Sequence, residues 1–213
     1  MVATMQVVVQ DHCFLVGDAS EASPRYDLLD WSSGIAGTMP TALLIDAGIQ
    51  SGTVTVSAAV CDERPPLEAD HQWGATTEWD DIAEVSVDVP GGMLTLAQLH
   101  YSTGAEPPPP PILSTSGPGS YRLRLHAFGR DQQYDQVVDN SAVRLHIIVW
   151  PEPITAPLII KSTSRCGYGL RVSEHHRVVP AESPTPPSAQ QEQADRDALI
   201  RRTLEEARRT PNY

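Results

Sequence analysis

The residues best suited to chemistry in this sequence are acids gathered between positions 62 and 84. Arg64 is the only base among them, and two tryptophans stand in the same polar context. Carboxylates beside aromatic anchors suit recognition of a basic cleft, because aromatic residues concentrate binding energy and complementary charge speeds encounter. The candidate partner-binding residues are Asp62, Glu63, Glu68, Asp70, Trp73, Glu78, Trp79, Asp80, Asp81 and Glu84. The alternative is a solvated loop whose acids keep the protein soluble while the tryptophans cap the core.

Other clusters are weaker candidates for catalysis or metal binding. His71 and the aspartates near it lack the frame of a calcium loop and the His-Glu-x-x-His of zinc proteases. Asp11-His12-Cys13 sets a base beside a nucleophile, but adjacent strand residues point to opposite faces. The three cysteines form no Cys-x-x-Cys pair. We therefore expect no catalytic residue, no metal and no cofactor, and a protein that is not an enzyme.

The charge of the chain is concentrated in its first part. Residues 1–120 hold sixteen Asp and Glu against two Arg and no Lys, while the net charge of the whole chain is -12. Such a surface repels phosphate backbones and attracts basic partners over roughly 8–10 Å. We expect a basic protein partner and no nucleic acid. Reversing Asp80 and Asp81 to lysine is then expected to slow association and to leave stability nearly unchanged.

The sequence shows no membrane or export signal. No run approaches the eighteen or so apolar residues that span a bilayer. The first residues, MVATMQVVVQDHCF, lack the basic start and the cleavage site of a signal peptide. These features predict a cytoplasmic protein with no membrane partner.

Short alternating segments predict an all-β fold. Val54, Val56, Ala58 and Val60 alternate with smaller or polar residues, as in a half-buried strand. Similar patterns place strands at residues 5–16, 43–49, 52–61, 83–89, 93–99, 121–128 and 143–150. Pro90-Gly91-Gly92 favours a hairpin between the fourth and fifth of these. The prediction is a β-sandwich of short antiparallel strands over residues 1–155, with at most one or two helical turns between positions 26 and 35.

The last third of the chain is expected to lie outside this domain. Residues 156–179 form a less defined extension, and residues 180–193 read as a disordered linker rich in Pro, Ser and Gln. Behind the linker, residues 194–213 hold a helix and a tail, with Ile200 and Leu204 on one face. Five consecutive prolines at 107–111 favour a stiff loop between strands.

Several of these segments together resemble the competence protein J family, small β-rich inhibitors of a DNA-entry nuclease. The resemblance covers roughly residues 5–151 and rests on Asp11-His12-Cys13-Phe14, on Asp30-Trp31, on the Gly-Thr-Val-Thr-Val run from Gly52, on Gly117-Pro118-Gly119-Ser120-Tyr121 and on Ile148-Val149-Trp150-Pro151. Bacterial immunity-type proteins share the pattern. The resemblance implies an inhibitor that binds a protein.

Charge and resemblance together favour one function. We expect a non-enzymatic acidic protein that inhibits or neutralises a basic partner, most plausibly a nuclease-type toxin. The alternative is a scaffold or secretion-associated interaction protein that uses the proline loop and the C-terminal helix.

Overall fold

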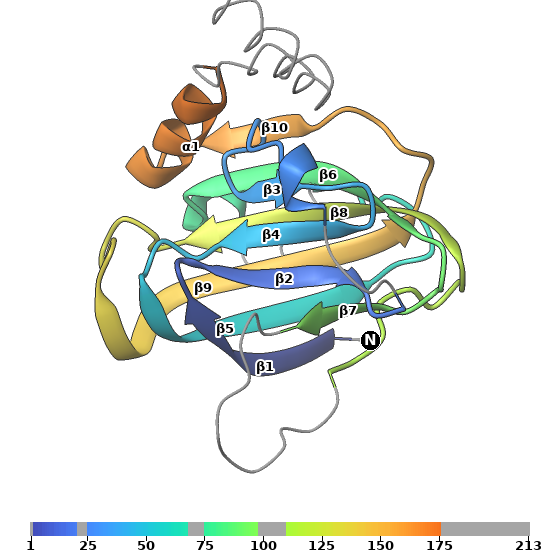
Figure 1. Ribbon diagram of the computed structural model, residues 1–213, viewed down its shortest axis with the longest axis horizontal. Coiled ribbons are helices and arrows are strands. Elements are labelled where there is room, and N and C mark those ends of the chain that lie inside the picture. Colours follow the sequence, from blue (N-terminus) through green and yellow to red (C-terminus); the bar gives the residue numbers. More distant parts are fainter. Residues whose placement is uncertain (1, 21–24, 68–74, 98–109, 176–213) are drawn as a thin grey trace, which may run out of the picture. The chain divides into compact units, whose positions relative to one another are not determined.

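Ten strands and one helix make up the described part of the chain. A computed structural model describes residues 2–20, 25–67, 75–97 and 110–175, which belong to one unit, Met1–His176 (Figure 1). The strands are β1 (Val2–Gln10), β2 (Cys13–Asp18), β3 (Ala36–Thr38), β4 (Ala42–Asp46), β5 (Ser51–Val60), β6 (Asp81–Val89), β7 (Leu94–Ala97), β8 (Gly119–Phe128), β9 (Val137–Pro151) and β10 (Leu158–Ser162). Two short 3-10 helices, η1 (Tyr26–Leu28) and η3 (Thr76–Glu78), precede the helix α1 (Arg165–His175). The predicted all-β class is confirmed.

The strands form one continuous sheet. Their order is β10-β6-β8-β9-β5-β1-β2-β4-β3, and β7 pairs with β2 beside this path. All pairings are antiparallel except that of β5 with β9. Strand β6 nevertheless packs against β2, β3 and β4, which lie far from it in the strand order. The sheet therefore curls round its own core, and a sandwich of two separate sheets is not confirmed.

The core fills the inner side of this curl. Val54 and Val56 of β5 face inward beside Val85 of β6 and Leu123 of β8, all fully buried. Period-2 alternation places these side chains on one face of each strand. In β8 the opposite face is buried as well, because other segments of the chain cover Arg122, Arg124 and His126. Alternation alone would place these three basic residues on an exposed outer face, but β8 is enclosed on both sides.

Three local predictions are corrected by the structure. The segment expected as one strand at 5–16 is two strands, because Asp11 and His12 turn the chain with positive φ angles of 48° and 70°. The hairpin expected between β6 and β7 does not form, since β6 is bordered by β8 and β10 and β7 pairs with β2. The extension expected at 156–179 contains β10 and α1.

Other predictions fall outside the described residues. These are the linker at 180–193, the helix at 194–213 and most of the proline loop. Within the described residues, no helix has the length and apolar character needed to cross a membrane.

Candidate partner-binding site

A buried arginine connects the parts of the fold that surround a cavity beside α1. Arg130, 1 % exposed, follows β8 and donates to Asp81 of β6 at 2.5 Å and to Asp46 of β4 at 3.1 Å. It also donates to the carbonyl of Gly34 at 2.9 Å. Two carboxylates that are distant in sequence thus share one guanidinium. Such a group is tolerated inside a protein only when it is paired and hydrogen-bonded.

The same network holds the start of α1. Both oxygens of Asp81 accept from Ser164, Oδ1 from its backbone N–H at 3.1 Å and Oδ2 from its hydroxyl. The Ser164 hydroxyl oxygen accepts the N–H of Gly167, and the Asp131 carboxylate accepts the N–H groups of Arg165 and Cys166 at 2.7 and 2.9 Å. The first turn of the helix therefore has its free N–H donors satisfied by side chains.

Gly167 allows the helix to approach this closely. A Cβ at this position would lie 2.9 Å from Arg130 Nη2 and 2.8 Å from Ser164 Oγ. No residue with a side chain fits there without movement of the buried network. The position of α1 on the sheet is consequently fixed by the arginine below it.

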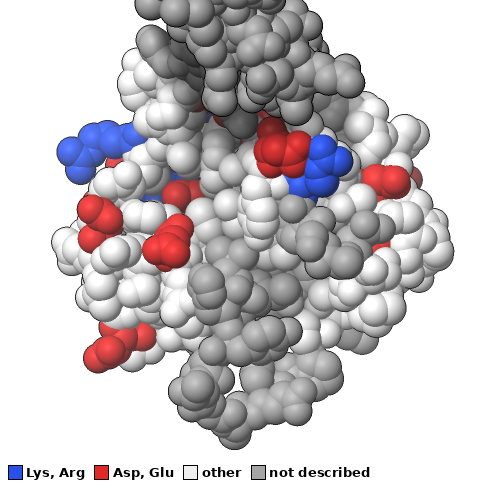
Figure 2. All heavy atoms as spheres, viewed as in Figure 1, with Lys and Arg blue, Asp and Glu red and all other residues white. Residues whose placement is uncertain are grey.

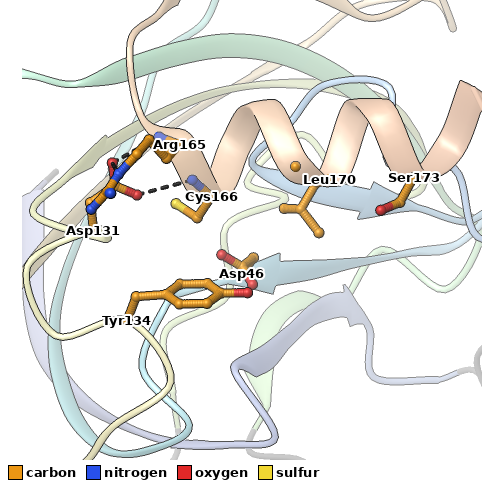
Figure 3. A pocket seen from close by; sticks show the side chains of 8 residues that line it. Asp46, Asp131, Tyr134, Arg165, Cys166, Leu170 and Ser173 are labelled. Atoms are coloured by element: carbon orange, nitrogen blue, oxygen red, sulfur yellow. Dashed lines mark hydrogen bonds and ion pairs between the residues drawn. The ribbon is translucent and has the colours of Figure 1, made fainter.

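A cavity of about 460 Å³ lies between α1 and the loop that follows β8. Figure 3 shows Tyr134 and Asp46 on the side opposite the helix, with Cys166, Leu170 and Ser173 along the helix above them. Asp131 and Arg165 border it at the start of the helix, where Arg165 Nε lies 3.7 Å from the Asp131 carboxylate. The cavity combines carboxylates, a phenol ring and an aliphatic side chain.

Left-handed backbone occurs beside this cavity. Asp11, His12 and Asp135 are the residues other than glycine with positive φ in the described part of the chain. His12 Nε2 lies 3.3 Å from Asp135, and the His12 ring lies 5.9 Å from that of Tyr134. His12 Nδ1 also lies 3.3 Å from the carbonyl of Gly48. Three loops, after β1, β4 and β8, are thus tied together next to Tyr134.

The titratable groups of the cavity do not form a nucleophile–base pair. Burial raises the pKa of the Cys166 thiol to about 11, so that at neutral pH it is not a thiolate. Burial also raises the pKa of Asp46, against the opposing effect of Arg130. The pKa of Tyr134 is raised by burial and by the neighbouring carboxylates, with Asp46 first. These groups suit electrostatic recognition rather than nucleophilic attack.

The residues predicted to bind a partner divide into three groups. Asp62, Glu63 and Glu78 are exposed, while Glu68, Asp70 and Trp73 lie outside the described residues. Trp79, Asp81 and Glu84 are buried, and half-buried Asp80 accepts the N–H of Gly129 at 2.7 Å. Buried side chains with partners inside the protein are not available to another molecule in this structure. Among the predicted acids that the structure describes, Asp62, Glu63 and Glu78 are the ones exposed to solvent.

Glu84 holds the covered outer face of the sheet together. It pairs with Arg124 at 3.0 Å, directly across the β6–β8 register, and with Arg64 at 3.1 Å. Arg122 lies 3.6 Å from it. The β8 arginines therefore pair across the strands with an acid of the same sheet.

Trp79 covers two buried histidines on the same face. Its ring lies 5.3 Å from that of His126 and 6.3 Å from that of His146, and the two imidazoles lie 5.7 Å apart. Burial lowers the pKa of His126 to about 3, assisted by His146 and Arg124. Burial lowers that of His146 to about 4, although its hydrogen bond with Ser57 acts in the opposite direction. Both imidazoles are neutral at pH 7.

The described surface is acidic because its bases are buried or engaged. The exposed acids are Asp11, Asp27, Asp62, Glu63, Glu78, Asp135 and Asp139, and the exposed bases in these ranges are Arg25, Arg64, Arg144 and Arg165. Each of these bases lies against an acid or an aromatic ring. Figure 2 shows separate acidic side chains on one face, with a basic group directly beside an acidic one.

Sequence reasoning missed the groups that form the cavity. Asp46, Arg130, Asp131, Tyr134 and Cys166 come from segments up to 120 residues apart in the chain. The sequence feature that pointed to this cavity was Gly129-Arg130-Asp131, a charged pair that follows a glycine at the end of an apolar strand. A buried role for Arg130 could have been inferred only with the partners Asp46 and Asp81 in place.

Comparison with known proteins gives similarity in fold. No protein-family model and no curated protein match the chain. Among solved structures it is similar to ComJ from Bacillus subtilis, described as an inhibitor of the DNA degrading activity of NucA. The identity is 11 %, the TM-score is 0.44, and the match covers 70 % of this chain and 98 % of that one. It is also similar to a protein described as crocagin biosynthetic gene J, at 17 % identity and a TM-score of 0.44, with 71 % and 99 % covered. The first of these two structures belongs to the family that the sequence resembles.

Proposed function

We propose that this chain is a non-enzymatic acidic binding protein that inhibits or neutralises a basic protein partner of the nuclease-toxin type. One observation carries the proposal: in the described residues the exposed acids outnumber the exposed bases by seven to four, and Asp62, Glu63 and Glu78 all present their carboxylates to solvent. Arg122, Arg124 and Arg130 are at most 3 % exposed and do not offset the surface acids at short range. A basic cleft, such as one that binds phosphates, is complementary to this surface.

The exposed loop acids give the proposal a direct test. The triple variant Asp62→Lys, Glu63→Lys, Glu78→Lys reverses three charges that are solvent-exposed. We expect association with the partner to slow by about tenfold or more at low salt, since steering by complementary charge contributes factors of that size. The unfolding midpoint should stay within a few degrees, because exposed substitutions usually change stability little.

The experiment begins with capture of a partner by the full-length chain from the cells that make it, followed by purification and stopped-flow association at several salt concentrations. Asp27→Lys is the control, because Asp27 is exposed but paired with Arg25 at 2.7 Å, away from the loop. Association rates that respond neither to salt nor to the triple variant would remove the acidic loop from the interface.

A further inference from the structure

The cavity under α1 offers more than a charged surface. Its volume of about 460 Å³ is enclosed by the helix on one side and by Tyr134 and Asp46 on the other (Figure 3). Leu170 supplies an aliphatic wall, Ser173 a hydroxyl and Asp131 a second carboxylate. A ligand here would meet acids, an aromatic face and a methyl-bearing side chain together. That combination suits a side chain with a long apolar stem and a positive end.

The charge near the cavity is unbalanced. The carboxylates in or around it are Asp11, Asp46, Asp81, Asp131 and Asp135, and the guanidinium groups are Arg130, Arg165 and Arg171, whose Nη1 lies beside Gly34. Arg130 is committed to Asp81 and Asp46 in the interior. Arg165, with a side chain 89 % exposed, lies at the rim 3.7 Å from Asp131, and carboxylates still outnumber guanidinium groups around the cavity. A cation that enters reduces this imbalance.

The loops that border the cavity hold a defined shape. Left-handed backbone at Asp11, His12 and Asp135 is an uncommon conformation that costs free energy. Contacts of His12 with Asp135 and Gly48 keep this conformation. These contacts hold Tyr134, which precedes Asp135, in place while the residue remains 55 % exposed. A preformed aromatic wall binds with less loss of conformational freedom.

We propose that the cavity receives an arginine side chain of the basic partner. The inference rests on the proposed function and names the group by which that partner is recognised. A guanidinium donates through several N–H groups in a planar fork, so it can bind the Asp131 carboxylate while it stacks on Tyr134. The two helix N–H groups on Asp131 leave acceptor sites on its oxygens. A lysine ammonium lacks the plane that stacks on the phenol.

The probe is N-acetyl-arginine N-methylamide, titrated into the full-length chain and followed by amide NMR shifts. We expect saturable shifts at Cys166, Gly169 and Leu170 with a Kd on the order of a millimolar, as for a ligand of this size. The neutral citrulline analogue, which has nearly the same shape, should bind at least about tenfold more weakly. Tyr134→Ala should weaken binding by about threefold or more. Tyr26→Ala is the matched control, because Tyr26 is similarly exposed at 49 % and does not line the cavity.

Three results would overturn the inference. Absence of saturable shifts at the lining amides, or equal binding of the citrulline analogue, would show that the cavity does not select a guanidinium. If the probe binds but Tyr134→Ala leaves the dissociation rate of the captured partner unchanged, the cavity takes a small guanidinium compound and not the partner's arginine. If the arginine probe does not bind but the chain still associates with its partner in a salt-dependent way, the proposed function stands and this inference fails. If the probe binds but the association with the partner does not depend on salt, the proposed function fails.

Discussion

Replacing Arg130 by methionine is expected to lower the free energy of unfolding by about 3–5 kcal/mol. Arg130 is 1 % exposed and donates to Asp81 and Asp46, both buried. Removing one member of a buried ionic group leaves the other charges desolvated and uncompensated, and this has costs of that size. For a chain of this length the midpoint should fall by roughly 6–20 °C. Equilibrium denaturation in urea measures the change.

Arg165→Met is the control for this prediction. It removes the same groups from a side chain that is 89 % exposed and 3.7 Å from its partner Asp131, and surface pairs contribute about 0–1 kcal/mol. Arg130→Lys keeps the charge without the fork and should lie between the two. If Arg130→Met costs no more than Arg165→Met, the network does not hold the fold together. The buried position of Asp81 also means that Asp81→Lys destabilises the protein, contrary to the expectation from sequence.

The second large effect is expected from acid. The pKa values of His126 and His146 are lowered by burial to about 3 and about 4 in the folded chain, against about 6.5 when unfolded. Below pH 6.5 the unfolded chain therefore binds protons that the folded chain does not. Each histidine removes up to about 1.4 kcal/mol of stability per pH unit, down to its folded pKa. Stability is full above pH 6.5 and falls between pH 6.5 and about 4.

Urea denaturation at pH 7, 6, 5 and 4.5 measures this slope. Two aspartates act differently from the histidines. The raised pKa of Asp46 opposes the loss of stability, because the folded chain takes up this proton before the unfolded chain does. The lowered pKa of Asp81 stabilises the folded chain, and this contribution is lost only below about pH 3.8. His126→Leu removes one proton site and should reduce the slope by up to half. An identical slope in parent and variant would show that His126 does not remain neutral in the fold.

Strand positions were predictable from sequence because alternation reports which face of a strand is buried. The valines of β5 and the alternating apolar residues of β8 and β9 show this directly. Alternation says nothing about which strands are neighbours. The parallel pairing of β5 with β9 and the curl that brings β6 against β4 depend on the whole chain. The helix α1 was missed because its sequence contains two glycines and no strong helical pattern. The N–H groups of its first turn are instead satisfied by the side chains of Asp131 and Ser164, which the sequence does not mark as helix caps.

The candidate site was less accessible to sequence reasoning. A cluster of acids in the sequence does not distinguish Glu63, which faces solvent, from Glu84, which binds three arginines. The β8 residues Arg122 and Arg124 read as a surface feature, yet other segments cover them. Burial of charge is decided by partners that lie far away in sequence. The acidic character of the surface was predictable from composition, and its distribution was not.

The central claim is that the acidic chain inhibits a basic nuclease. The most direct measurement titrates the full-length chain into a DNA-degradation assay of the purified partner that it captures. We expect that activity is lost at about one chain per partner molecule and returns as salt is raised, with weaker inhibition by the triple variant Asp62→Lys, Glu63→Lys, Glu78→Lys. Full nuclease activity in the presence of a formed complex, or a captured partner that degrades no DNA, would contradict it.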